Sequence, residues 1–171
     1  MLLQLQLLTR QLLFFRYITD GTTNTNPTYV YPVTSSASST NGSYYPGNAF
    51  DGSTGNINVF WWAGGYCPQW IQADFGSSPK CINTFRYFSL NIYYTNPTQF
   101  TLQASNIDGS GYIDLYTGSI EGLPVLNAWS PLYGFSNNTV YRYYRLYIHH
   151  TYYDGNWPAI NELQLGEAQH Y

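Results

Sequence analysis

The chain has little charge and almost no lysine. Charged residues make up 9% of its 171 residues, the net charge is −3, and Lys80 is the single lysine. No cluster of Lys and Arg is large enough to follow a phosphate backbone. We therefore expect no nucleic-acid partner.

Cysteine is equally scarce, because Cys67 and Cys81 are the only two. Two cysteines are too few for a disulfide scaffold, and a domain of this size does not need one for stability. They could form one bridge in an oxidising compartment or remain two thiols in a reducing one. With no C-x-x-C and no Cys/His metal spacing, we expect no zinc site.

Sequence motifs of catalysis are missing too. The 9 acidic residues are scattered, and no serine, histidine and acid stand in a nucleophile-elbow context. His149 and His150 have no cysteine or serine frame around them, and a lone acid such as Asp154 beside histidine is common in inert loops. We expect that the protein is not an enzyme.

Long uninterrupted apolar runs are absent, which argues against a membrane span. The most apolar segment is residues 1–19, where Arg10 and Arg16 interrupt the run. It lacks the basic start and the small-residue cleavage site of a signal peptide. Its apolar residues share one face at a period of two, although a helix fits as well. We expect an apolar arm that packs on its own domain or on a neighbouring subunit.

Aromatic residues are abundant, at 19% of the chain. Many lie in short runs in which apolar and polar residues alternate, as in a strand with one buried face. The predicted buried faces are Ile71, Ala73 and Phe75; Phe88, Leu90 and Ile92; Phe100, Leu102 and Ala104; Tyr144, Leu146 and Ile148; and Leu163 with Leu165. Gly, Pro and Asn clusters separate these runs, and no helical period is sustained after residue 20. The pattern predicts an all-β antiparallel sandwich or jelly roll.

Seven motifs follow one another in a specific order: SSASST, NAFDGSTGN, FWW, PQWIQADFG, FTLQASNIDG, YRYYRLYI and INELQLG. In this order the chain resembles discoidin domains, also called F5/8 type C domains, which include the galactose-binding-like carbohydrate-binding modules. The resemblance implies an eight-stranded jelly-roll β-sandwich that binds a ligand through loops at one end, without catalysis. It divides the chain into the arm (1–19), a linker (20–32), the discoidin-like domain (33–167) and a C-terminal tail (168–171).

The resemblance also implies a structural cation, often calcium, in the AFDG turn. Its ligands here would be Asp51, Glu162 and oxygens of Ala49, Ser53 and Asn56, a donor set that suits calcium. Ser53 stands where many relatives carry a second acid, which weakens the site. The alternative is that Asp51 caps the turn through backbone hydrogen bonds and that Glu162 is solvated.

Sugars present apolar C–H faces and hydroxyl edges, so a sugar site needs aromatic rings beside hydrogen-bonding groups. The segment from His149 to Trp157 combines aromatic rings, imidazoles and an acid. The resemblance assigns one of Trp61 and Trp62 to the core, and Trp70 as well. The candidate ligand-binding residues are Tyr44, Tyr45, Trp62, Tyr66, His149, Tyr152, Tyr153, Asp154 and Trp157.

Two functions remain open. The first is a non-catalytic carbohydrate-binding or adhesion module for galactose-type or other glycans, displayed on a larger assembly. The second is a structural subunit of a virion, phage particle or extracellular filament, with self-association or docking through residues 1–19. Both place the protein outside cells or on a particle surface. The loops have almost no Lys or Arg, so binding to an anionic lipid membrane through these loops is the weaker alternative.

Overall fold

The computed structural model describes residues 27–54, 56, 58–122, 125–153 and 156–167. The arm, most of the linker and the C-terminal tail lie outside these residues. Within these residues there are two short 3-10 helices, η2 (Pro46–Phe50) and η3 (Tyr93–Thr95), and neither is long and apolar enough to cross a membrane. The described strands are β1 (Thr28–Val30), β2 (Thr34–Ala37), β3 (Trp61–Trp62), β4 (Gln69–Asp74), β5 (Thr84–Phe88), β6 (Pro97–Ser105), β7 (Ile113–Ser119), β8 (Tyr133–Gly134), β9 (Tyr143–Thr151), β10 (Ala159–Ile160) and β11 (Glu162–Glu167).

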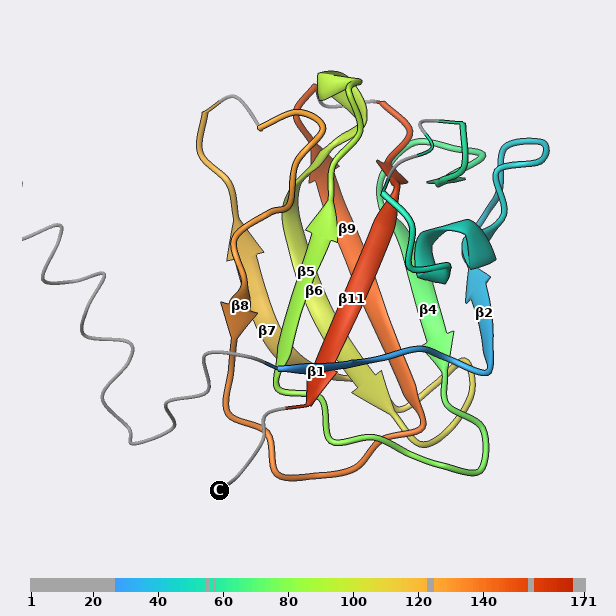
Figure 1. The fold of residues 1–171 in the computed structure, drawn as a ribbon, viewed down its shortest axis with the longest axis vertical. Coiled ribbons are helices and arrows are strands. Elements are labelled where there is room, and N and C mark those ends of the chain that lie inside the picture. The colour runs from blue at the N-terminus through green and yellow to red at the C-terminus, as the bar shows by residue number, and fades with distance from the viewer. Residues whose placement is uncertain (1–26, 55, 57, 123–124, 154–155, 168–171) are drawn as a thin grey trace, which may run out of the picture.

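The strands form two packed antiparallel sheets. One has four strands in the order β1-β11-β5-β8, and the other has five in the order β2-β4-β9-β6-β7. β3 and β10 form a further short antiparallel pair. In Figure 1 the four-stranded sheet lies in front of the five-stranded sheet. The predicted all-β sandwich is therefore confirmed.

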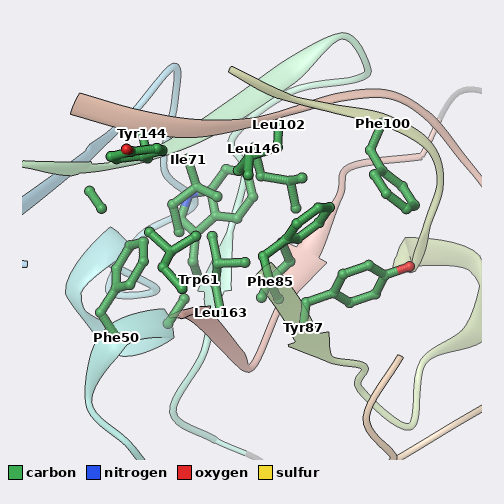
Figure 2. Close-up of a cluster of buried hydrophobic side chains, with 14 of the residues drawn as sticks. Phe50, Trp61, Ile71, Phe85, Tyr87, Phe100, Leu102, Tyr144, Leu146 and Leu163 are labelled. Atoms are coloured by element: carbon green, nitrogen blue, oxygen red, sulfur yellow. The ribbon is translucent and has the colours of Figure 1, made fainter. Parts of the chain in front are cut away.

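The core lies between the two sheets and consists of alternate residues from their strands. Figure 2 shows Ile71, Leu102 and Leu146 of the five-stranded sheet packed against Phe85 and Leu163 of the four-stranded sheet. All five are at most 2% exposed. Since burial of such a side chain stabilises the fold by about 1.5–3 kcal/mol, this alternation is the main source of stability. The predicted inward faces of β4, β6, β9 and β11 are confirmed.

The inward face of β5 differs from the prediction. The core residues are Phe85 and Tyr87, whereas Phe88 lies on the outer face and Leu90 follows the strand. The pairing with β11 sets this register, because Phe85 lies opposite Leu165 and Tyr87 opposite Leu163. A buried tyrosine is acceptable here because its hydroxyl donates to the Pro97 carbonyl oxygen at 3.0 Å.

The first strand lies in the segment that was expected to be a linker. β1 pairs with the last strand, with Thr28 opposite Glu167 and Val30 opposite Leu165. Three residues are too few to show an alternating pattern, so the sequence does not mark this strand. Its pairing attaches residues 28–30 to the edge of the four-stranded sheet.

The two cysteines stay apart. No disulfide forms within the described part of the chain, which includes both residues. Cys67 packs against the core, and the thiol of Cys81 donates to the backbone oxygen of Asn137 at 3.4 Å. Burial raises the pKa of the Cys81 thiol, and the negative charge of Glu167 raises it further.

Candidate functional site

One end of the sandwich gathers most of the candidate residues. There β6 begins and β9 ends, with Pro97 paired to Thr151, and β11 begins at Glu162. We name this region the loop end, and it comprises the described residues of segments 41–68, 89–96 and 152–162. It therefore contains both the AFDG turn and the aromatic segments that the sequence marks.

Glu162 is a buried carboxylate at the loop end. Its side chain is shielded from solvent, with 0% exposure, and both carboxylate oxygens accept from the backbone N–H of Gly52 at 3.2 Å. Burial raises the pKa of Glu162 to about 8, and the nearby charge of Asp51 adds to this effect. Within the described residues the one ion pair is between Arg142 and Asp74, so no arginine or lysine there compensates the charge of Glu162.

The turn that covers Glu162 depends on Asp51 and Gly52. The Asp51 Oδ1 atom accepts from the backbone N–H of Ser53 at 2.8 Å, which closes the turn. Gly52 has a φ of +77°, a conformation that glycine adopts without strain, and a Cβ there would lie 3.2 Å from the Tyr31 hydroxyl. Asp51 thus caps the turn as the alternative expects, whereas Glu162 is not solvated.

The remaining candidate ligands lie around the same turn. Ala49 is buried in η2, and the carbonyl oxygen of Asn56 accepts from the side-chain amide of Asn161 at 3.2 Å. The described residues contain no group of three or more His, Cys, Asp and Glu side chains that could hold a metal. Two carboxyl groups with backbone oxygens still suit a hard cation such as calcium, and no basic side chain in the described residues competes for the Glu162 oxygens.

Aromatic rings form a continuous cluster beside this turn. Tyr44 stacks on Phe60 with ring centroids 4.4 Å apart and meets Trp62 edge-on at 5.5 Å. Trp62 then contacts Trp157 at 6.3 Å, and Trp157 contacts Tyr66 at 6.1 Å. We name these five residues the aromatic cluster. Four of them are candidate ligand residues, and they come from three separate segments of the sequence.

The two adjacent tryptophans have different environments. Trp61 is completely buried, and its Nε1 donates to the Ser39 carbonyl oxygen at 3.1 Å. Trp62 is only partly buried, yet its Nε1 is shielded from solvent and has no hydrogen-bond partner. Trp61 is therefore the core residue that the resemblance implied, and Trp62 belongs to the cluster. Trp70, also expected in the core, is instead partly exposed on the outer face of β4.

Other candidate residues lie at the loop end outside this cluster. Tyr152 and Tyr153 form an edge-to-face pair at 5.2 Å just after β9, and Tyr153 is 53% exposed. Tyr45 precedes η2 and is 60% exposed. Asp154 lies outside the described residues.

His149 occupies a different position from the one expected. It belongs to β9 rather than to the following loop. Its Nε2 is 2.9 Å from the Thr101 hydroxyl, and its ring packs on Tyr147 at 5.0 Å, on the outer face of the five-stranded sheet. The strand extends this far because β6 continues to pair with it, with Gln99 opposite His150.

Some features of the loop end were not found from the sequence. Phe60 is the stacking partner of Tyr44, and the FWW motif is the signal that could have suggested it. Four buried polar atoms in the described residues have no hydrogen-bond partner, and three are at the loop end: Trp62 Nε1, Asn96 Oδ1 and Asn161 Oδ1. Buried polar groups are normally paired, so such a concentration marks a functional region.

Comparison with solved structures finds carbohydrate-binding modules. The CBM32 module of AlyQ, in complex with 4,5-unsaturated mannuronic acid, is 26% identical with a TM-score of 0.66, and the match covers 82% of this chain and 99% of that one. The family 32 module of NanJ from C. perfringens, in complex with galactose, is 19% identical with a TM-score of 0.63, covering 78% and 93%. Chitosan-binding module 2 from a chitosanase/glucanase of Paenibacillus sp. IK-5, in complex with chitotriose, is 21% identical with a TM-score of 0.60, covering 78% and 95%.

The family model of the F5/8 type C domain matches residues 33–163. No curated protein sequence gives a significant match. Because the family model covers well over half of the chain, the protein belongs to the F5/8 type C domain family.

Proposed function

We propose that the protein is a non-catalytic carbohydrate-binding module whose sugar ligand lies over the aromatic cluster at the loop end. The observation that carries this proposal is the continuous row of rings from Tyr44 to Tyr66. Tyr66 is 65% exposed and Trp157 is partly exposed, so the row offers ring surface to the apolar face of a sugar. Modules of similar fold are solved with a mannuronic acid derivative, galactose and chitotriose, which supports a carbohydrate ligand without fixing the sugar.

The same proposal includes a calcium ion between the Asp51 turn and Glu162. A bound cation would neutralise the buried carboxylates and hold the turn against β11. Asn161 holds the following loop, because its side-chain amide donates to the carbonyl oxygens of Asn56 and Val59 at 3.2 and 2.7 Å. That loop leads directly to Phe60, so the cation would also position the aromatic cluster.

A glycan array tests the sugar site. The intact protein is applied in calcium and again in EDTA, and a glycan that binds is then titrated. We expect Trp157→Ala to weaken binding by about tenfold or more, since a buried aromatic anchor commonly contributes at least 1–2 kcal/mol. Tyr153→Ala should have a smaller effect.

Trp70→Ala is the matched control, because Trp70 is also a partly exposed tryptophan but lies on a sheet face. It should bind as the wild type does. Loss of binding in Trp70→Ala with full binding in Trp157→Ala would contradict the proposed position. If the protein binds no glycan in either condition, the result contradicts the carbohydrate proposal and favours assembly.

Assembly is the second candidate function. It rests on the apolar character of residues 1–19, and it would make the domain a displayed component of a virion, phage particle or extracellular filament. Light scattering should show large species for the full chain and a monomer for residues 20–171. Equal masses for the two would contradict it.

A further inference from the structure

The outer face of the four-stranded sheet carries an arginine packed against two aromatic rings. The Arg86 Cζ atom lies 4.2 Å from the centroid of the Trp129 ring and 4.8 Å from that of Tyr29. The Arg86 Nε donates to the side-chain oxygen of Gln164 at 2.9 Å. Tyr29, Arg86, Gln164 and Trp129, which we name the Arg86 stripe, come from four distant parts of the sequence.

Strand pairing builds the Arg86 stripe. Gln164 lies opposite Arg86, and Tyr29 lies opposite Gly166, two residues farther along β11. Trp129 is held from the other side, where it meets the Phe88 ring edge-on at 5.3 Å. The loop before it is fixed to the end of β5, since the Ser89 hydroxyl donates to the Ala128 carbonyl oxygen at 3.0 Å. The guanidinium is therefore held in one orientation before any ligand arrives.

Arg86 has no acidic partner among the described residues. The ion pair found there joins Arg142 to Asp74, and the hydrogen bond of Arg86 uses Nε alone. Its two terminal nitrogens are left as donors on a partly exposed surface. Arg145 on the other sheet differs, because its partner Gln103 also bonds Asp114, which places an acid beside it.

We infer that the Arg86 stripe is a second binding site, for the carboxylate of an acidic sugar such as a uronate. An arginine fork binds a carboxylate through two parallel hydrogen bonds, and a fork already oriented by packing loses little entropy in doing so. Tyr29 and Trp129 are only partly buried and flank the fork with apolar surface for sugar C–H groups. A single cation on a chain of net charge −3 does not suit nucleic acid. This site shares no residue with the aromatic cluster.

Titration with an oligogalacturonate tests the inference on the full chain, with the indole N–H signals of the tryptophans as the readout. We expect the Trp129 signal to shift, and we expect a neutral oligosaccharide of equal length not to shift it. Arg86→Gln should weaken uronate binding by about tenfold or more, the range for a hydrogen bond to a charged group. Arg86→Lys keeps the charge but removes the fork, and it should weaken binding nearly as much.

Two controls separate this site from the others. Arg145→Gln removes the comparable arginine of the opposite sheet and should bind uronate normally. In Trp157→Ala the uronate should still shift the Trp129 signal, whether or not binding at the loop end is lost. Circular dichroism and the thermal midpoint confirm that each variant is folded.

Four results would overturn the inference. The first is that the wild type does not bind uronate, and the second is that Arg145→Gln loses as much uronate affinity as Arg86→Gln. The third is a loss of uronate affinity in Trp157→Ala that Arg86→Gln does not share, and the fourth is that a polyglutamate peptide binds as tightly as the uronate.

Discussion

Each end of the sandwich has a carboxyl group in a strand, with a basic partner at one end and without one in the described residues at the other. Where β4 ends and β9 begins, Arg142 donates to both carboxylate oxygens of Asp74, at 2.7 and 2.9 Å, and the hydrogen bonds hold the pKa of Asp74 below its usual value. At the loop end, Glu162 is buried beside Asp51 with no basic partner in the described residues, and its pKa is raised to about 8.

The difference indicates where function resides. Asp74, Arg142 and Asn106 satisfy one another, because the Asn106 side-chain oxygen accepts the backbone N–H of Arg142 at 2.8 Å. The groups at this end therefore contribute to stability and need no ligand to pair them. The loop end retains a buried carboxyl group that has no basic partner in the described residues, together with unpaired buried polar atoms, and proteins tolerate such groups mainly at functional sites.

The largest expected effect is a pH dependence of stability that calcium removes. The pKa of Glu162 is about 8 in the folded protein against an ordinary value of 4.5. Between these values the folded state binds more protons than the unfolded state. The contribution of the protonated Glu162 to the free energy of unfolding is therefore complete below pH 4.5 and is lost as the pH rises through 8. The slope approaches about 1.4 kcal/mol per pH unit. Urea unfolding in EDTA from pH 5 to pH 9 should show this fall, and calcium should reverse it because a cation stabilises the ionised form.

Glu162→Gln is the control for this measurement. It has no charge to bury, so in EDTA at pH 9 it should be more stable than the wild type, and added calcium should stabilise it less. If the wild type is equally stable at pH 5 and pH 9 in EDTA, or Glu162→Gln responds fully to calcium, the cation proposal is wrong.

The smallest effect is expected at the opposite end. Asp74→Asn removes an ion pair whose arginine side chain is 42% exposed, and solvent weakens such pairs. The lowered pKa of Asp74 gives stability above its ordinary pKa that is lost as the pH falls through the folded value, which is opposite in sense to Glu162. Thermal midpoints at pH 3 and pH 7, with and without calcium, should show a small change at pH 7 and none from calcium. A calcium-dependent midpoint difference would contradict the contrast between the two ends.

The fold was predictable where local pattern and burial agree. Ile71, Leu102 and Leu146 alternate with polar residues in runs long enough to show a period of two, and all three are buried. The face of β5 was not predictable, because TFRYF offers aromatic residues on both faces and only pairing with β11 selects between them. Three-residue β1 carries no periodic signal at all.

The candidate site was predictable only in its parts. The sequence marked Trp62, Tyr66 and Trp157 through their turn-rich surroundings, but not that their rings touch in a row. It placed His149 in a loop because polar residues follow it, whereas pairing with β6 keeps it in a strand. The Arg86 stripe has no local signature, since Tyr29 and Trp129 meet Arg86 only through tertiary structure.

Each of the five tryptophans has its own indole N–H signal, so these signals test the position of the carbohydrate site directly. Trp61 is in the core, Trp62 and Trp157 are in the aromatic cluster, and Trp70 and Trp129 lie on the outer faces of the two sheets. Titration of the labelled protein with a neutral glycan identified on the array should shift the signals of Trp62 and Trp157 and leave those of Trp70 and Trp129 in place. A shift confined to Trp70 or Trp129 would contradict a carbohydrate site at the loop end.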